Sequence, residues 1–440
     1  MRSFDPFGLS RELAATHERV AAGALELRLG TAQLDPFRGK EWPGLTTYEQ
    51  VRALDPTDPL REPLRRWLFH LIDQRIQTPW LLEEGRLLHQ VRHPLDSPRR
   101  GQFSLVEMAK HGAEAEGEER VAWWDGFMAH ERELGELRAG LWQRRVEVAR
   151  RLGEDPEQRL LSPVDQPEQL VDAARRYLEA TREVARAHGA GSWLGLLELA
   201  EARGASEGLP ARLAPDSVLE LLGGRHWVRG LKLRLTLPER RVPASFARAL
   251  ELFGEGWHEA LARADLPFVV AREPRRAGAL RTGVLLASRW TSPVFWRRRL
   301  GLGKAQAQAS ALAFSLAWLA EGRRRALAVL VRASALDSGE ALGQAAVELS
   351  TRELGEEWGS RSMLARLEVP VGADCEFAAL VSGFEAAREA GERMDEDYFD
   401  DPRFFERLRD EAAQPPTAPL DGAGLLEGAG RVAAAFQRDV

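Results

Sequence analysis

The 440-residue sequence has few of the residues that cross-link a chain or anchor it in a membrane. It contains a single cysteine, Cys375, so no disulfide can form within the chain, and a reducing compartment is expected. No run approaches about 18 consecutive apolar residues, and the N-terminus lacks the apolar segment of a signal peptide. These absences predict a cytoplasmic protein that does not insert into a membrane.

Lysine is also scarce, because only four of the 61 basic residues are lysines and the rest are arginines. The net charge of −6 gives the chain no general attraction to nucleic acid or to anionic membranes. Hydrophobic residues make up 44% of the sequence and charged residues 29%, which is typical of a globular protein rather than a disordered one. The chain is long enough for one large helical fold or for two to three ordinary domains.

Several enzyme signatures are missing from the sequence. It has no G-x-x-x-x-G-K-[ST] phosphate loop, no glycine-rich dinucleotide fingerprint after a strand, and no G-x-S-x-G nucleophile turn. Nothing in the sequence therefore indicates nucleotide hydrolysis, dinucleotide chemistry or a serine hydrolase of that type.

A stretch near the middle of the chain, residues 243–261, has the pattern of a helix with one buried face. Its apolar residues recur at spacings of three or four and are Phe246, Leu250, Phe253, Trp257 and Leu261. We predict a helix here whose apolar stripe lies in the protein core.

A narrow polar strip runs beside this apolar stripe. Glu251, Glu255 and His258 recur at i, i+4 and i+7, which places them on adjacent turns of one helix face. The segment GEGWH at 254–258 has the frame of the zinc-peptidase motif H-E-x-x-H, with Gly254 in place of the first histidine. In the intact motif the two histidines bind zinc and the glutamate takes a proton from the metal-bound water. Gly254 has no side chain and cannot be a ligand.

The residues around this helix extend the pattern. Leucine alternates with Lys232, Arg234 and Thr236 over residues 231–237, which is the period of a half-buried strand, and Pro238 ends it. The whole run 231–302 resembles the catalytic region of the helical zinc oligopeptidases. This is the family of thimet oligopeptidase and oligoendopeptidase F, and angiotensin-converting enzyme is a more distant member.

The resemblance implies a mainly α, large two-lobed fold with one short β strand or hairpin beside a central cleft. Residues 1–155 are expected to form an N-terminal helical lobe and residues 156–440 a C-terminal lobe that carries the motif helix, within one continuous fold. In the family a glutamate on a following helix is the third zinc ligand. It falls near Leu280 here, and no acidic residue stands at 280–282. Tyrosines on a late helix face the cleft in the family, whereas the matching helix here has Phe384.

Loss of two of three zinc ligands predicts a catalytically inactive relative, a pseudopeptidase that binds a peptide or partner protein in its cleft and needs no cofactor. The ligand-binding residues are expected to be Lys232, Arg234, Glu255 and His258, and the last two would be remnants of the catalytic site. Two alternatives remain open. One is a zinc metallopeptidase with relocated ligands, such as His258 with Glu255 or Glu251 and a distant histidine. The other is a helical structural or interaction protein with no cleft function.

A second histidine pair, His89 and His93, is spaced one helical turn apart and could in principle bind a metal. Pro94 follows directly, so the pair is expected in the last turn of a helix. There histidines commonly interact with the negative end of the helix dipole. We favour this second interpretation.

Overall fold

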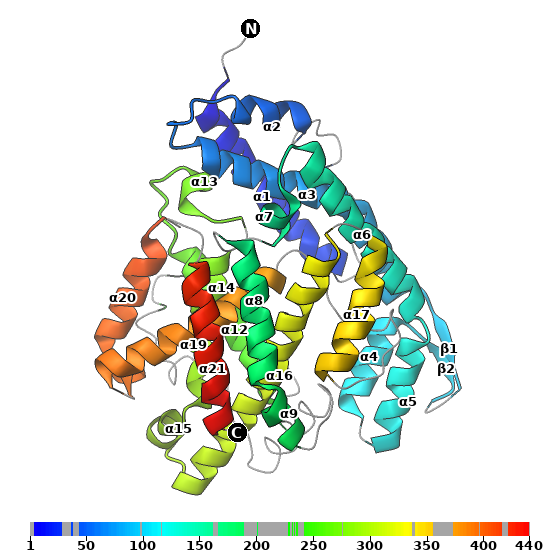
Figure 1. The fold of residues 1–440 in the computed structure, drawn as a ribbon, viewed down its shortest axis with the longest axis vertical. Helices are drawn as coiled ribbons and strands as arrows, with labels where there is room; N and C mark the ends of the chain where they lie inside the picture. The colour runs from blue at the N-terminus through cyan, green and yellow to red at the C-terminus, as the bar shows by residue number, and fades with distance from the viewer. Residues whose placement is uncertain are drawn as a thin grey trace.

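The computed structural model is mainly helical, which confirms the predicted fold class (Figure 1). No helix in the part of the chain that is described is long and apolar enough to cross a membrane. The structure describes residues 4–28, 37, 44–96, 99–115, 117–161, 166–188, 200, 228, 231, 233, 235, 242–274, 276–336, 339–354, 373–395, 397–415 and 421–439.

The helices begin where the local sequence favours a start. Proline occupies the first turn of α7, α8, α12, α15 and α20, where its missing N–H costs no hydrogen bond. In the first half of the chain the helices are α1 (Pro6–Arg28), α2 (Leu45–Arg52), α3 (Arg61–Gly85), the π-helical turn η1 (Arg86–Gln90), α4 (Leu105–Glu114), α5 (Gly117–Met128), α6 (Glu131–Arg151), α7 (Pro156–Leu160), α8 (Pro167–Ala180) and α9 (Arg182–Ala187). In the second half they are α12 (Pro243–Ala260), α13 (Phe268–Ala271), α14 (Ala277–Ser288), η3 (Arg289–Thr291), α15 (Pro293–Leu300), α16 (Lys304–Ser334), α17 (Gly339–Leu354), α19 (Ala373–Met394), η4 (Tyr398–Asp400), α20 (Pro402–Ala413) and α21 (Gly422–Asp439).

The main core is built around α16, a helix of 31 residues that is buried along most of its length. Its apolar residues face outward on nearly all sides, so α8, α12, α17 and α19 can each pack against it. Core residues come from both ends of the chain, for example Leu13 in α1 and Phe436 in α21. The two predicted lobes therefore share one core, and the boundary at residue 155 stays a prediction.

A second, smaller core lies at one edge of the molecule, where η1, a β-hairpin, α4, α5 and the start of α6 pack together (Figure 1). We call this part, residues 86–137, the satellite. The buried hydrophobic residues of its core are Leu87, Leu105, Met108, Trp123, Phe127 and Leu134.

The hairpin of the satellite pairs β1 (His93–Leu95) with β2 (Gly101–Phe103) in antiparallel register, with His93 opposite Phe103. It is far along the chain from the strand that was predicted beside the motif helix at residues 231–237. Of that predicted strand, Leu231, Leu233 and Leu235 pack on the main core, and the other residues lie outside the described part. The prediction of a strand there is therefore not tested.

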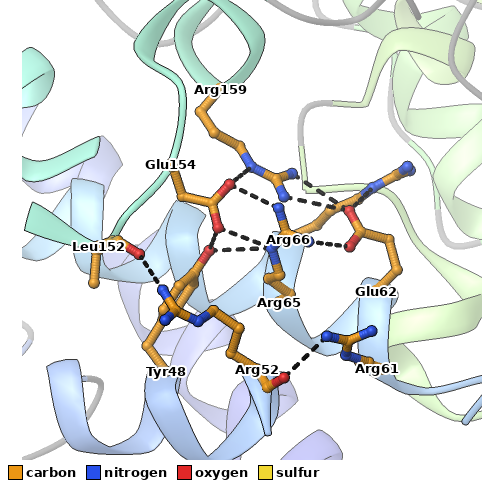
Figure 2. A network of polar contacts seen from close by, with 9 residues as sticks. All are labelled: Tyr48, Arg52, Arg61, Glu62, Arg65, Arg66, Leu152, Glu154 and Arg159. Carbon is orange, nitrogen blue, oxygen red and sulfur yellow. Dashed lines mark hydrogen bonds and ion pairs between the residues drawn. The ribbon is translucent and has the colours of Figure 1, made fainter. Parts of the chain in front are cut away.

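The N-terminal helices are joined to the end of α6 by a buried carboxylate (Figure 2). Glu154 accepts two hydrogen bonds of 2.8 Å from Arg65 of α3, one of 2.6 Å from Arg159 of α7, and a short one from the Tyr48 hydroxyl of α2. Burial alone would raise the pKa of Glu154, but these donors outweigh it and lower the pKa to about 2. One carboxylate thus holds α2, α3 and α7 together.

Candidate functional site

The predicted motif helix is confirmed as α12, which runs from Pro243 to Ala260. Phe246, Leu250, Phe253 and Trp257 are all buried on its apolar stripe. Leu261 follows the helix as its C-terminal cap and packs against the same core. The strip of Glu251, Glu255 and His258 lies beside this stripe, toward α14 and α16.

Glu251, at one end of the strip, is fully buried and belongs to an ion-pair network. Both its oxygens accept hydrogen bonds of 2.9 Å from Arg325 of α16, and Arg248 donates a third at 2.7 Å. Burial opposes the charge of Glu251, but Arg325 and Arg248 outweigh it and hold the pKa of this carboxyl below its usual value. Glu251 therefore has a structural partner, which does not favour its role as a relocated metal ligand.

Gly254, in the place of the missing first histidine, lies against the backbone of α14. A Cβ atom on Gly254 would lie 2.7 Å from the Cα of Gly283 and 3.0 Å from Cδ1 of Leu286. Gly283 is itself crowded by α12, because a Cβ on Gly283 would lie 2.2 Å from the carbonyl oxygen of Glu251. The backbone of α14 thus occupies the space that a ligand side chain at position 254 would need.

Glu255, the glutamate that would act as the base in an intact motif, is paired with an arginine. Arg276 reaches back from the start of α14 and places Nη1 2.5 Å from Oε1 of Glu255. The Glu255 side chain is only 8% exposed, whereas that of Arg276 is 53% exposed. Burial raises the pKa of Glu255, and Arg276 opposes this shift.

Arg276 has an unusual backbone conformation. It is the N-cap of α14 with φ of 55°, in the left-handed region that residues other than glycine seldom adopt. Such conformations persist only where the surroundings impose them, and they gather at functional sites. The conformation fits the position of Arg276 between the loop after α13 and the carboxylate of Glu255.

His258 contacts α14 through Thr282. Its Nδ1 lies 2.9 Å from Oγ1 of Thr282, and the Thr282 hydroxyl lies 3.1 Å from the carbonyl oxygen of Gly278. Since the hydroxyl donates to that carbonyl, it accepts from Nδ1–H of His258. Burial and the nearby Arg281 lower the pKa of His258 to about 4, so the imidazole is neutral at pH 7.

Leu280, where the third ligand was expected, faces a different neighbour. It packs with Cys375 and Ala379 of α19, and the α14 residue that meets His258 is Thr282. Neither residue is an acid. Phe384, at the position of the family's tyrosine, packs against Trp318 and Phe436 in the core.

These side chains do not fit a zinc site of the peptidase type, which needs three protein ligands and one open position. Gly254 offers no donor, Thr282 is neutral, and Glu255 is already bound by Arg276. Within the described ranges, no three His, Cys, Asp or Glu side chains are placed to hold a metal ion.

Two further residues of the predicted site, Lys232 and Arg234, lie outside the described residues. A surface groove of about 550 Å³ lies between α7, α8, α16 and α17, and none of the predicted site residues lines it. The predicted cleft beside Glu255 and His258 therefore stays a prediction.

Solved structures with a similar fold include peptidases. PZ peptidase A, solved with an inhibitor, matches 96% of this chain and 87% of its own, with 10% sequence identity and a TM-score of 0.56. A protein of Chlamydophila abortus described as a candidate peptidase matches 89% of this chain and 81% of its own, with 10% identity and a TM-score of 0.55. A carboxypeptidase of Pyrococcus furiosus matches 98% of both chains, with 11% identity and a TM-score of 0.49.

Comparisons of the sequence itself are negative, since no protein-family model and no curated protein sequence matches it. The likeness to the first two structures concerns the fold alone, because identity is 10% in both. The chain therefore has a peptidase-like helical fold, and its closer relationship to the thimet and oligoendopeptidase F family stays a prediction.

Proposed function

We propose that this chain is a pseudopeptidase, an inactive protein with a peptidase-like fold that binds a peptide or a partner protein. The observation that carries the proposal is the contact between α12 and α14. Because the backbone of Gly283 fills the space beside Gly254, the first metal ligand is not simply absent but sterically excluded. A return to activity would require the two helices to move apart.

The state of Glu255 supports the same proposal. A general base must reach the proton that it removes, with no other group bound in that place. Glu255 is already held by Arg276. The guanidinium of Arg276 supplies a positive charge next to Glu255, where an active enzyme of this kind would have its metal.

Binding is supported by the charged groups that remain exposed around this strip. Arg276 is half-exposed, Arg272 is 39% exposed and lies 3.7 Å from Glu259, and both arginines act electrostatically on Glu255 or Glu259. Such a mixed surface can interact with the termini and charged side chains of a peptide. Contacts of partly exposed charges are individually weak, so we expect weak binding with little sequence preference.

Metal content is the first test. After purification in the presence of zinc, elemental analysis should find far less than one zinc per chain. About one zinc per chain, lost in the His258→Ala variant, would overturn the proposal in favour of a metallopeptidase with relocated ligands.

Peptide binding is the second test. Titration with a library of extended peptides, followed by product analysis, should show weak binding and no cleavage. In the Arg276→Asn variant, which keeps a residue that tolerates positive φ, we expect about fivefold weaker binding, the size of one partly exposed charge contact. Arg263→Ala is the matched control, because Arg263 is similarly exposed at 50% but pairs with Asp265 beyond the end of α12.

Three outcomes would count against the proposal. Hydrolysis that depends on zinc would show an enzyme. Binding that is unchanged in Arg276→Asn would place the peptide elsewhere. No binding to any peptide would leave a helical structural or interaction protein as the remaining function.

A further inference from the structure

Two histidines of the satellite are stacked on each other. His93 lies in β1, and His130 is the residue before α6, at the junction with α5. Their ring centroids are 3.6 Å apart at an interplanar angle of 38°. His93 is only 7% exposed, and its Nε2 is buried without a hydrogen-bond partner. The expectation that His93 shares a final helical turn with His89 is wrong, because His89 lies in the last turn of η1 and His93 belongs to the hairpin.

Few charges are positioned to compensate protons on this pair. Burial lowers the pKa of His93, and His130 lowers it further, while Glu133 of α6 opposes both effects. Burial lowers the pKa of His130 as well, again against Glu133. Both rings are therefore neutral at pH 7.

Three other charged or titratable groups of the surrounding elements have partners of their own. Arg92, before β1, pairs with Glu107 of α4, and Arg86 of η1 pairs with Glu83 of α3. His111 of α4 stacks on Trp123 of α5, with ring centroids 4.6 Å apart. Glu133 is thus the acid that acts on the stacked pair.

The pair lies where a local opening is possible, because the satellite has a core separate from the main one. The satellite is joined to the main body through α3 and α6. There Arg138 pairs with Glu84 at 2.6 Å, and the ring of Trp80 packs against Gly140. Since these contacts lie on the main-body side of the stacked rings, the hairpin can separate from the α5–α6 junction while they persist.

We propose that the His93–His130 stack is a pH-sensitive latch, which closes the hairpin onto the α5–α6 junction at neutral pH and releases it when both rings are protonated. The physical cause is repulsion. Two imidazolium rings at this distance would place like charges in contact, with one of them buried and with Glu133 as the carboxylate that acts on both. In the open state each ring is solvated and takes up a proton at its ordinary pKa, so proton uptake is coupled to opening.

Amide hydrogen exchange of the full chain, followed by mass spectrometry at pH 7.5 and pH 5.5, tests the latch. After correction for the intrinsic pH dependence of exchange, protection of peptides from residues 86–137 should fall by about tenfold or more. This is the factor that one proton site contributes one pH unit below its ordinary pKa of about 6.5. Peptides from α16 should show no such change.

Variants make the test specific. His93→Phe keeps an aromatic ring in the stack but removes one of the two charges, so the loss of protection at pH 5.5 should shrink to the part that burial of His130 alone contributes. His130→Phe should likewise leave only the part that burial of His93 contributes, and it serves as the second variant if the first folds poorly. Glu133→Gln removes the carboxylate that opposes these shifts, so the loss of protection at pH 5.5 should become larger.

His111→Phe is the matched control, because His111 is a satellite histidine that stacks on Trp123 rather than on another histidine. It should open at pH 5.5 as the unmodified chain does. Unchanged protection of the satellite between pH 7.5 and pH 5.5 would overturn the proposal. So would pH-dependent opening of undiminished size in both phenylalanine variants.

Discussion

A single methyl group at position 254 tests the helix contact on which the proposed function depends. In Gly254→Ala the new Cβ would lie 2.7 Å from the Cα of Gly283, closer than side-chain carbons approach other carbon atoms in folded proteins. The neighbour is backbone, so it cannot rotate away as a flexible side chain could, and α14 must shift. Overpacking of this kind typically costs about 1–3 kcal/mol. Replacing glycine by alanine also stabilises a helix by about 1 kcal/mol, and this gain partly offsets the cost of overpacking in the measured stability.

Gly256→Ala in the same helix removes this ambiguity. Among the described residues, a Cβ on Gly256 would meet only Cδ2 of Leu233, at an ordinary distance of 3.6 Å, so the variant should gain about 1 kcal/mol from helix propensity. The propensity gain is common to both variants and cancels in their difference. Gly254→Ala should therefore be less stable than Gly256→Ala by about 1–3 kcal/mol.

Thermal unfolding followed by far-ultraviolet circular dichroism, with the two variants measured side by side, gives this difference. A lower midpoint for Gly254→Ala is expected, and Gly254→His, with a much larger side chain, should be lower again. Equal midpoints for the two alanine variants would refute the reasoning. The space beside residue 254 would then be open, and a missing histidine would be no more than a point substitution.

Three further predictions concern stability. Trp257 is 0% exposed, so Trp257→Ala should cost about 3–5 kcal/mol and lower the thermal midpoint; an unchanged midpoint would mean that α12 is not part of the core. Glu251→Gln removes one of the carboxylates that bind the buried guanidinium of Arg325, while Glu321 remains 2.8 Å from its Nε, and should cost about 1.5–3 kcal/mol in urea unfolding; a neutral effect would show that the pair adds nothing. The pKa of Glu154 falls from 4.5 to about 2 on folding, so this group should contribute about 3 kcal/mol above about pH 5, a contribution lost as the pH falls toward 2. Urea titrations between pH 7 and pH 2 should show that this part of the acid dependence is missing in Glu154→Gln.

The sequence predicted α12 well because its signal is local. The apolar spacing, the proline at its start and the polar strip all lie within the helix itself. The reason for glycine at position 254 could not be predicted, since the close partner, Gly283, lies in another helix and leaves no trace in the pattern of α12.

The residue opposite His258 shows how errors of register arise. Successive residues of an α-helix are rotated by about 100°, so an error of two residues turns a side chain by about 200°, to the opposite face. The expected ligand position, Leu280, packs against α19, whereas Thr282 packs against α12. The pairing of Arg276 with Glu255 could not be predicted from the sequence. Arg276 precedes a helix, and no spacing pattern reveals its left-handed backbone conformation.

The hairpin at 93–103 escaped prediction for a related reason. Each strand has only three residues, too few for an alternating pattern to emerge. Pro94 was read as the end of a helix, and η1 does end before it, at Gln90. The ring contact between His93 and His130 depends on tertiary packing and could not be seen from the spacing of His89 and His93.

The ion pair between Glu251 and Arg325 also fixes the rotational orientation of α12 about its own axis. Any rotation would pull the carboxylate away from a guanidinium that has no exit to solvent. With α12 fixed in this way, His258 points toward α14, where Gly278 lies beside its ring. A side chain at Gly278 would begin 3.7 Å from Cε1 and Nε2 of His258, which is an ordinary contact distance, and no backbone atom of the described residues lies closer. If a metal site were to be built into this protein, its second ligand should come from position 278 on α14 rather than from the position that the peptidase motif assigns to it.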